Sequence, residues 1–353
     1  MLASDNCNID LLGLFVAIQH IAIQHIGGST MRLTRLLPAL ALSLPLGLAA
    51  TLSPAAAETE LTIMSYNVWG GGGNEQKPVD ETVAVIKAAG ADIIGVQETR
   101  LEPEDCTADV CPAAGDSVAK KIAAALGYHY YDQSKVNDAL WANAIISRYP
   151  IGPATPNDLG VPVDVEGRKV WVFNIHLDDS PYQPYQLLDI EYGAFPFIKT
   201  EAEAVKFAQE TRGHALKLLF DDMKAAEGAD ATFIFGDFNE PSFRDWTAET
   251  VKAGHNPIPV RFPTTAAIEE AGFTDTYRAV FPDPVAKPAY TWTPTSEPTA
   301  TDDHHDRIDF AFARAKDLNV ISAAIVGEKP EAAEIVVTPW PSDHRATVAR
   351  ISF

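Results

Sequence analysis

The stretch from Phe233 to Glu240 constrains the fold of this chain more than any other segment. It reads Phe-Ile-Phe-Gly-Asp-Phe-Asn-Glu, and its short apolar run predicts a strand that is covered on both faces. Gly236 allows the backbone to turn closely where that strand ends. Asp237 and Asn239 follow, and a carboxylate and an amide in this place can hold a divalent metal, a phosphate or a water. The alternative is an Asx turn that only caps the strand.

Polar side chains stand at the ends of six predicted strand segments in all. They are Asn67, Glu98, His176, Asp237 with Asn239, Asp309, and Asp343 with His344. Taken singly, each has a plain structural explanation, such as a solvated acid or a histidine that caps a strand. Asp309 is different, because a carboxylate placed inside a strand usually needs a partner. In a layered α/β fold, sites form where several strand ends converge.

The order of the predicted elements indicates one α/β domain with mixed sheets. Strands are predicted at 61–69, 92–98, 140–150, 169–179, 233–237, 307–313 and 346–353, and helices at 78–89, 115–126, 201–224 and 262–272. Strands alternate with helices early in the chain and follow one another late, which favours one domain over two. The four glycines at 70–73 predict a flexible loop that something approaches closely. The length of 353 residues and the hydrophobic content of 46% allow a sizeable core.

Residues 1–57 lie before the predicted domain, which covers 58–353. A short basic region at 31–35, an apolar run at 36–52 with prolines inside it, and three alanines at 55–57 follow the plan of a secretory signal peptide. The run is too short and too broken for a stable membrane span. We therefore expect a signal over about 31–57, cleavage near Glu58, and a secreted or periplasmic mature chain. Residues 1–30 are expected to be an upstream extension without a function.

The acidity of the chain bears on its partners. The formal net charge is −21, and removal of residues 1–57 leaves it unchanged. Such a charge repels polyphosphate backbones at long range and favours divalent cations, although a local basic groove can coexist with it. Cys106 and Cys111 remain in the mature chain, and an even number of cysteines in an exported chain predicts a disulfide. A zinc site is the alternative, but no Cys or His pair accompanies them at zinc spacing.

Two further segments stand out from the pattern. Residues 180–199 are rich in aromatics and prolines, and a segment of this length and composition is either a lid or rim beside the site or a loop packed for structure only. Residues 302–306 read Asp-Asp-His-His-Asp. We expect an exposed loop there, whose histidines are solvated rather than bound to a metal.

The residue types at the strand ends point to metal-assisted chemistry. Glu98 and Asp343 supply hard oxygen ligands, and Mg²⁺ prefers one or two carboxylates together with waters and substrate phosphate oxygens. His176 and His344 are suited to acid–base work near neutral pH. Asp309 can orient one imidazole and raise its basicity. Neither a serine elbow nor a P-loop motif is present, so acyl transfer and NTP-cradling mechanisms lack support.

Six short motifs occur in order along the chain. The motifs are Ser65-Tyr66-Asn67-Val68-Trp69, Gly95-Val96-Gln97-Glu98, Asn174-Ile175-His176-Leu177-Asp178, Gly236-Asp237-Phe238-Asn239, Arg307-Ile308-Asp309-Phe310 and Ser342-Asp343-His344. Each motif is weak alone, but all six in order are specific, and together they resemble those of the endonuclease/exonuclease/phosphatase superfamily. That superfamily includes deoxyribonuclease I, apurinic endonucleases, neutral sphingomyelinases and inositol phosphatases, and the resemblance spans residues 61–353.

The resemblance implies a four-layer αββα sandwich of two packed mixed sheets. It also implies Mg²⁺- or Mn²⁺-dependent hydrolysis of a phosphoester by in-line attack of water. The metal would be held mainly by Glu98, with help from Asn67 and Asp343.

The same resemblance assigns the catalytic roles. Asp237 would activate or orient the water, and Asn239 would hold the phosphate. His344, paired with Asp309, would contact the phosphate and stabilise developing charge. His176 would protonate the leaving oxygen or bind the phosphate. The choice between Asp237 and His344 as the base stays open.

The substrate is also left open by the resemblance. We expect a monomeric phosphodiesterase or phosphatase that acts on a small or lipid-derived phosphoester, because the chain is acidic and residues 181–197 are rich in aromatics. The alternatives are a secreted endonuclease like deoxyribonuclease I and a sphingomyelinase-like phospholipase C. The absence of a basic cluster interleaved with aromatics speaks against nucleic acid. A binding module on an inactive scaffold is disfavoured, because every residue that the resemblance requires is present.

Overall fold

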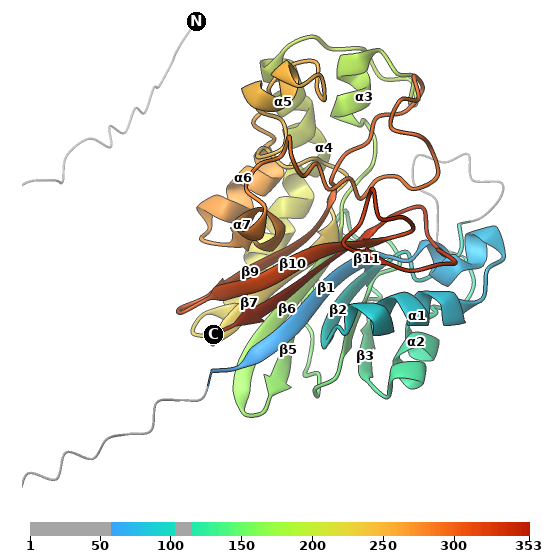
Figure 1. Ribbon diagram of the computed structural model, residues 1–353. Coiled ribbons are helices and arrows are strands. Elements are labelled where there is room, and N and C mark those ends of the chain that lie inside the picture. The colour runs from blue at the N-terminus through green and yellow to red at the C-terminus, as the bar shows by residue number, and fades with distance from the viewer. Residues whose placement is uncertain (1–57, 103–113) are drawn as a thin grey trace, which may run out of the picture. The chain divides into compact units, whose positions relative to one another are not determined.

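A computed structural model gives the fold of residues 58–102 and 114–353, which contain two mixed β-sheets (Figure 1). The larger sheet has seven strands in the order β11-β10-β12-β1-β2-β4-β3. They are β1 (Glu60–Asn67), β2 (Ile93–Gln97), β3 (His129–Asp132), β4 (Ala144–Ser147), β10 (Asn319–Gly327), β11 (Ile335–Val336) and β12 (Ala346–Ser352). The smaller sheet has five strands in the order β5-β6-β7-β9-β8. They are β5 (Gly160–Val165), β6 (Arg168–His176), β7 (Ala231–Asp237), β8 (Thr274–Asp275) and β9 (Asp309–Ala315).

Helices cover the outer face of each sheet, so the domain has four layers, as predicted. The helices α1 (Val79–Ala89) and α2 (Ala119–Leu126) pack on the seven-stranded sheet, and α4 (Glu201–Met223) and α6 (Pro263–Glu270) pack on the five-stranded sheet. Shorter elements join these layers. They are the helices α3 (Gln183–Leu188), α5 (Ala248–Lys252) and α7 (Thr276–Val280), and the 3₁₀ helices η1 (Trp69–Glu75) and η2 (Lys224–Ala226).

The predicted double-sided burial of β7 is confirmed, and it explains how the sheets are held together. Phe233 and Phe235 belong to the core cluster between the two sheets, where Ile63 of β1 and Ile93 of β2 also lie. Ile234 points the other way and joins the cluster beneath α4 and α6. The alternation of side chains along a strand therefore places β7 in two cores at once.

The two sheets approach each other closely at Gly95 of β2. A Cβ atom at this position would lie 2.5 Å from Cβ of Phe235 and 2.7 Å from Oδ1 of Asn174. Buried amides bridge the sheets beside it, because Gln97 Nε2 donates to Asn174 Oδ1 at 2.6 Å and Asn174 Nδ2 donates to Gln133 Oε1 at 3.0 Å. Glycine is required here because the side chains of Phe235 and Asn174 occupy the space that a Cβ atom would need.

The predicted helices correspond closely to α1, α4 and α6, but the glycine-rich segment differs from its prediction. Residues 70–73 lie in η1, and Gly70, Gly71 and Gly72 are buried with positive φ. A Cβ atom on Gly71 would lie 2.8 Å from Cγ2 of Val118. The close approach that the glycines permit is therefore made by Val118, just before α2, and the segment is an ordered turn.

Five strands were not anticipated from the sequence, and two of them, β8 and β11, have only two residues each. The edge strand β3 is short and half exposed, so its residues carry little hydrophobic pattern. β5 lies at the edge of the other sheet, and Pro162 interrupts its sequence pattern. β10 has an exposed first half and a buried second half, which hides the period of two that marks a half-buried strand.

The expectation of a solvated loop at 302–306 is wrong. His305 and Asp306 are buried. Asp306 Oδ2 accepts a hydrogen bond from the Tyr182 hydroxyl at 2.7 Å, and its Oδ1 accepts one from Trp246 Nε1 at 2.9 Å. Residues from distant segments hydrogen-bond to this acidic stretch and keep it buried, and the composition of the stretch does not reveal these partners.

Segment 180–199 is partly helical, because α3 lies within it. Its Tyr182 and Tyr185 donate hydrogen bonds to Asp306 and Asp303, so the segment is docked on the stretch 302–306.

Two predictions fall outside the described residues. They are the N-terminal extension with its signal at 1–57 and the disulfide between Cys106 and Cys111. Within the described residues, no helix is both long and apolar enough to cross a membrane.

Candidate active site

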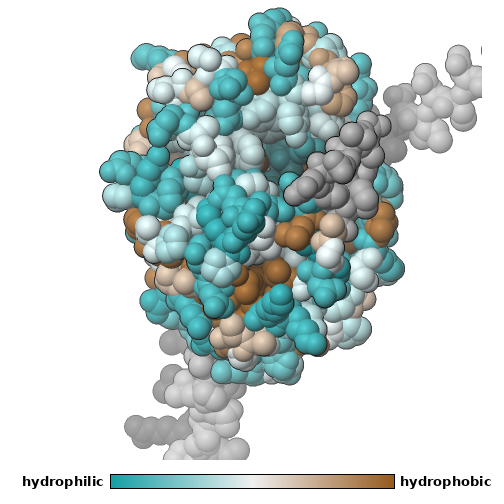
Figure 2. All heavy atoms as spheres, turned by 90° about the vertical axis from the view of Figure 1, so that its right-hand side faces the viewer, coloured by the Kyte–Doolittle hydropathy of each residue, from teal (hydrophilic) through white to brown (hydrophobic). Residues whose placement is uncertain are grey.

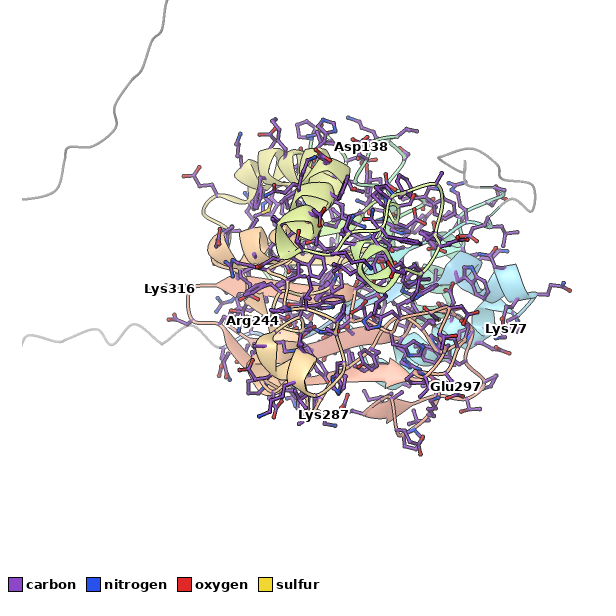
Figure 3. The ribbon with its side chains drawn as sticks, turned by 90° about the horizontal axis from the view of Figure 1, so that it is seen from above. Lys77, Asp138, Arg244, Lys287, Glu297 and Lys316 are labelled. Atoms are coloured by element: carbon purple, nitrogen blue, oxygen red, sulfur yellow. The ribbon has the colours of Figure 1, made fainter. Side chains whose placement is uncertain are left out.

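The predicted site residues come from both sheets and lie at one end of them. β1 runs parallel to β2, and β6 runs parallel to β7, and all four strands end on this side (Figure 1). β12 and β9 are antiparallel to β1 and β7, so they begin there. Figure 2 shows this face, where hydrophilic side chains surround a recess. In Figure 3, Lys77 and Glu297 lie at this end of the molecule and Lys316 lies at the opposite end.

The centre of the site is a cluster of possible metal ligands. Glu98, Asp237 and His344 each place one ligand atom within 4.8 Å of the other two. Asn67 links the two carboxylates, because its Nδ2 donates to Glu98 Oε1 at 2.7 Å and to Asp237 Oδ2 at 3.0 Å. The Oδ1 atom of Asn67 accepts from the backbone N–H of Trp69 at 3.2 Å, which fixes the orientation of its amide.

The turn after β7 both caps the strand and presents a carboxylate oxygen to the site. Asp237 Oδ1 accepts from the backbone N–H of Asn239 at 2.9 Å, which is an Asx turn. The other oxygen of Asp237, Oδ2, faces Asn67, His176 and His344. Capping and function therefore use different atoms of one carboxylate.

His176 and Asn239 form the second part of the site. Asn239 Nδ2 lies 3.2 Å from His176 Nε2 and donates to the carbonyl of Leu177 at 3.0 Å. His176 Nε2 lies 3.8 Å from Asp237 Oδ2 and 4.0 Å from Glu98 Oε1. One donor amide and one imidazole thus flank the carboxylate cluster, where they can contact the oxygens of a bound phosphate.

His344 lies between two carboxylates. Its Nδ1 lies 2.9 Å from Asp309 Oδ2, and its Nε2 lies 3.5 Å from Asp237 Oδ2. Asp309 is held by the Thr291 hydroxyl oxygen, which accepts from its backbone N–H at 3.1 Å. Burial on its own would lower the pKa of His344, but Asp309 and Asp237 outweigh it and hold this pKa well above the ordinary histidine value. The two carboxylates therefore favour the cationic form of the imidazole.

The carboxylates of Glu98 and Asp343 have fewer hydrogen-bond partners in the protein than their oxygens can accept. Glu98 Oε2 and Asp343 Oδ1 are buried and have no hydrogen-bond partner. Burial, followed by the charge of Asp343, raises the pKa of Glu98 well above its usual value. Burial also raises the pKa of Asp343 to about 6. Unpartnered carboxylate oxygens in a buried cluster fit a hard divalent cation such as Mg²⁺ or Mn²⁺.

All eight predicted site residues belong to this one cluster. Seven of them are joined by direct contacts, and Asp343 acts electrostatically on Glu98 and His344. As it is placed, Asn67 presents its amide nitrogen to the acids and so orients them, while its predicted ligand role stays a prediction.

Sequence reasoning missed the residues that hold these side chains. The Trp292 ring centre lies 5.0 Å from that of His344. The Ser342 hydroxyl donates to the carbonyl of Asn67 at 2.8 Å and accepts from the backbone N–H of His344 at 3.1 Å. The run from Tyr290 to Thr293, which combines aromatic and threonine residues ahead of the acidic stretch 302–306, was the one available signal.

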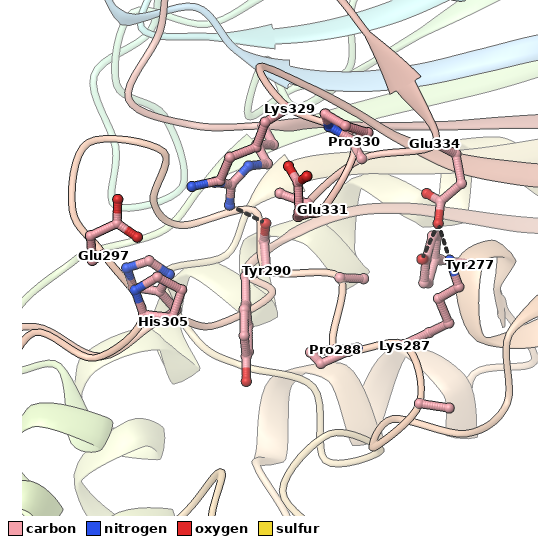
Figure 4. Close-up of a pocket in the computed structure, with 16 residues that line it drawn as sticks. Tyr277, Lys287, Pro288, Tyr290, Glu297, His305, Lys329, Pro330, Glu331 and Glu334 are labelled. Atoms are coloured by element: carbon pink, nitrogen blue, oxygen red, sulfur yellow. Dashed lines mark hydrogen bonds and ion pairs between the residues drawn. The ribbon is translucent and has the colours of Figure 1, made fainter.

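A separate cavity of about 540 Å³ lies between residues 286–290 and residues 329–334, which follow β10 (Figure 4). Tyr277, Tyr290, Lys329 and Arg345 are among its lining residues, and none of the eight site residues lines it. Arg345 donates to the carbonyl of Tyr290 at 2.9 Å. The cavity is therefore adjacent to the candidate site but distinct from it.

Comparisons with known proteins give one relative by sequence and several by structure. A Caenorhabditis elegans protein, described as uncharacterized protein F14F9.5, is 25% identical over 305 residues, which are 83% of this chain and 91% of that protein. An endonuclease/exonuclease/phosphatase from Beutenbergia cavernae is similar with a TM-score of 0.47 at 19% identity, over 83% of this chain and 71% of that chain. An AP endonuclease from Archaeoglobus fulgidus is similar with a TM-score of 0.46 at 18% identity, over 82% of this chain and 98% of that chain.

The family model gives the decisive match. The model of the endonuclease/exonuclease/phosphatase family, whose name covers enzymes that cleave phosphoester bonds, matches residues 64–344. This range contains every residue of the site described above, from Asn67 to His344. The chain therefore belongs to the endonuclease/exonuclease/phosphatase family.

Proposed function

We propose that this protein is a Mg²⁺- or Mn²⁺-dependent hydrolase that cleaves a phosphoester by in-line attack of water. One observation carries the proposal. Glu98, Asp237 and His344 come from the ends of strands in both sheets, and one ligand atom of each lies within 4.8 Å of the other two. Buried acids of this density are costly unless they do electrostatic work.

The metal would be held by Glu98 with Asp237, Asp343 and Asn67 beside it. When bound, such a cation neutralises charge on the phosphoryl oxygens and polarises the phosphorus for attack. The unpartnered oxygens of Glu98 and Asp343 are the atoms that this assignment uses.

The remaining residues act on water and phosphate. Asp237 would orient the attacking water and accept its proton, because its Oδ2 faces the centre of the site. His344, whose cationic form is favoured by Asp309 and Asp237, would donate from Nε2 to a phosphoryl oxygen as negative charge develops there. Asn239 would hold another oxygen, and His176 would donate a proton to the leaving oxygen.

The test is hydrolysis of bis-p-nitrophenyl phosphate with Mg²⁺, measured in parallel with p-nitrophenyl phosphate, sphingomyelin and supercoiled plasmid. Glu98→Ala and His344→Ala should each lower kcat at least about a hundredfold, as loss of a main electrostatic stabiliser does. His214→Ala is the matched control, because His214 is exposed on α4. Near-normal turnover in either site variant would refute the assignment, and nicked plasmid as the dominant product would favour the endonuclease alternative.

We also propose that the mature chain is exported and begins near Glu58. The signal-like plan of residues 31–57 supports this. N-terminal sequencing of the processed protein tests it, and a chain that retains residues 31–57 would contradict it. A count of two free thiols on the unreduced mature protein would likewise exclude the disulfide between Cys106 and Cys111.

A further inference from the structure

Three aromatic side chains form a continuous row that begins at the candidate site. We call Tyr185, Tyr192 and Trp292 the aromatic wall. Trp292 contacts His344, with ring centres 5.0 Å apart, and its Nε1 lies 3.3 Å from the Tyr185 hydroxyl. The ring centres of Tyr185 and Tyr192 lie 5.8 Å apart, and Tyr192 is 43% exposed. The wall therefore leads from the candidate phosphate site to the surface.

The rings of the wall are set at steep angles to one another. Tyr185 meets Tyr192 at 88°, and on its other side it meets Tyr182 at 89°. Trp292 is tilted by 57° from the ring of His344. Flat nucleobases stack on parallel faces, whereas faces that point in different directions suit a compact group with no plane of its own.

The polar atoms of the wall already donate hydrogen bonds to carboxylates of the protein. The Tyr185 hydroxyl donates to Asp303 Oδ1 at 2.5 Å, and Trp292 Nε1 lies 3.3 Å from the same oxygen. The Tyr192 hydroxyl donates to Asp179. These groups are not left to bind the acceptors of a substrate. A hydroxyl that donates to an anion also makes its ring more electron-rich, which strengthens the attraction of the ring face for a cation.

Apart from His344, whose ring contacts Trp292, the charges that act on the tyrosines of the wall are negative. Burial raises the pKa of Tyr192, and the negative charges of Asp179 and Glu102 raise it further. Burial and the charge of Asp343 raise the pKa of Glu98, and the charge of Glu102 also raises it by a smaller amount. Glu102 thus lies within electrostatic reach of both the wall and the metal cluster, and a positive group placed between them would be stabilised.

We propose that the aromatic wall is a subsite for a compact cationic group, so that the substrate is a phosphoester with an alkylammonium substituent. This inference rests on the proposed function and specifies its substrate class. In the reaction, the oxygen of water forms a bond to phosphorus and the bond from phosphorus to the other ester oxygen breaks. That oxygen leaves with a proton, and the alkylammonium phosphate is released.

Two chromogenic diesters of the same shape test the charge alone. One is p-nitrophenyl phosphocholine, and the other is p-nitrophenyl 3,3-dimethylbutyl phosphate, in which carbon replaces the ammonium nitrogen. With Mg²⁺ present, kcat/KM for the cationic ester should be higher by about fivefold or more, as expected for a cation on aromatic faces. Equal values, or a preference for the neutral ester, would overturn the inference and leave the proposed function intact. Failure to hydrolyse these diesters and bis-p-nitrophenyl phosphate would overturn both.

Variants of exposed tyrosines locate the preference. Tyr192→Leu should bring the ratio of the two kcat/KM values toward one, because it removes a ring face from the wall. Tyr130→Leu is the matched control, since Tyr130 is 40% exposed on β3 of the other sheet and should leave the ratio unchanged. A ratio that survives Tyr192→Leu would show that the wall does not bind the cation.

The same headgroup can come from a soluble diester or from a lipid. Release of phosphocholine from phosphatidylcholine vesicles would point to the lipid source. Hydrolysis of glycerophosphocholine in solution would point to the soluble one. Either supports the proposal, and turnover of neither while p-nitrophenyl 3,3-dimethylbutyl phosphate is cleaved would refute it.

Discussion

Replacement of Asp309 by asparagine gives the most direct test of how the site works. Asp309 is fully buried, and its Oδ2 lies 2.9 Å from Nδ1 of His344. Asparagine keeps the size of the side chain and removes its charge. The variant therefore isolates the electrostatic support that His344 receives, with little change in packing.

The expected size of the effect follows from this single contact. A hydrogen bond to a charged group contributes about 1.5–3 kcal/mol, and each 1.36 kcal/mol changes a rate about tenfold. If the contact acts in the transition state, Asp309→Asn should lower kcat by about ten- to 150-fold. The pKa of His344 should fall as well, because the nearer of its two carboxylate partners loses its charge.

Turnover of bis-p-nitrophenyl phosphate and an NMR titration of the His344 ring measure the two effects. Asp158→Asn is the control. Asp158 is also buried and accepts from the Tyr131 hydroxyl at 2.5 Å, but it lies outside the site. Its variant should lose stability and keep kcat. A kcat within threefold of the parent for Asp309→Asn, or an unshifted His344 titration, would refute the role of the pair.

Three further outcomes are expected. Gly95→Ala should destabilise the fold by about 1–3 kcal/mol in urea unfolding, because its Cβ would lie 2.5 Å from Phe235. Gly213→Ala in α4, where nothing lies within 4 Å, should instead add about 0.5–1 kcal/mol. Burial alone would raise the pKa of Asp275, but Arg307 outweighs it and keeps this pKa below its ordinary value. The stability from this pair should therefore be complete above about pH 4 and lost as pH falls through the folded-state pKa, and Asp275→Asn should abolish that acid-dependent part of the urea midpoint. Mg²⁺ at a hundred times its Kd should stabilise the fold by about 2.7 kcal/mol and raise Tm by roughly 5 °C. A Glu98→Gln variant with the same Tm shift would contradict the metal assignment.

The sequence was sufficient to predict the fold class and to name eight candidate site residues that the structure brings together. The apolar run before Asp237 marks a strand buried on both faces, and polar residues at strand ends converge because parallel strands end at a common edge. Asn67, Glu98 and His176 could be assigned in this way from their places in the chain. The four-layer sandwich was implied by the family resemblance and not by this pattern, and the structure shows how β7 contributes to two of its cores.

The sequence was not sufficient where a residue depends on a partner far along the chain. Asp306 looks solvated by composition, yet Tyr182 and Trp246, 124 and 60 positions away, satisfy both of its oxygens inside the protein. Trp292 carries no motif that ties it to His344, because only the folded chain brings the two rings together. Local composition reports average exposure, whereas these positions are set by single tertiary contacts.

The division of the site between two sheets has a consequence for how activity is acquired. Glu98 follows a strand of one sheet, and Asp237 ends a strand of the other, with Asn67 hydrogen-bonded to both. Neither half of the sandwich alone carries enough groups to act on a phosphoester. A folding intermediate with only one layer formed would be inert, so the protein gains its chemistry in the same event that closes its core.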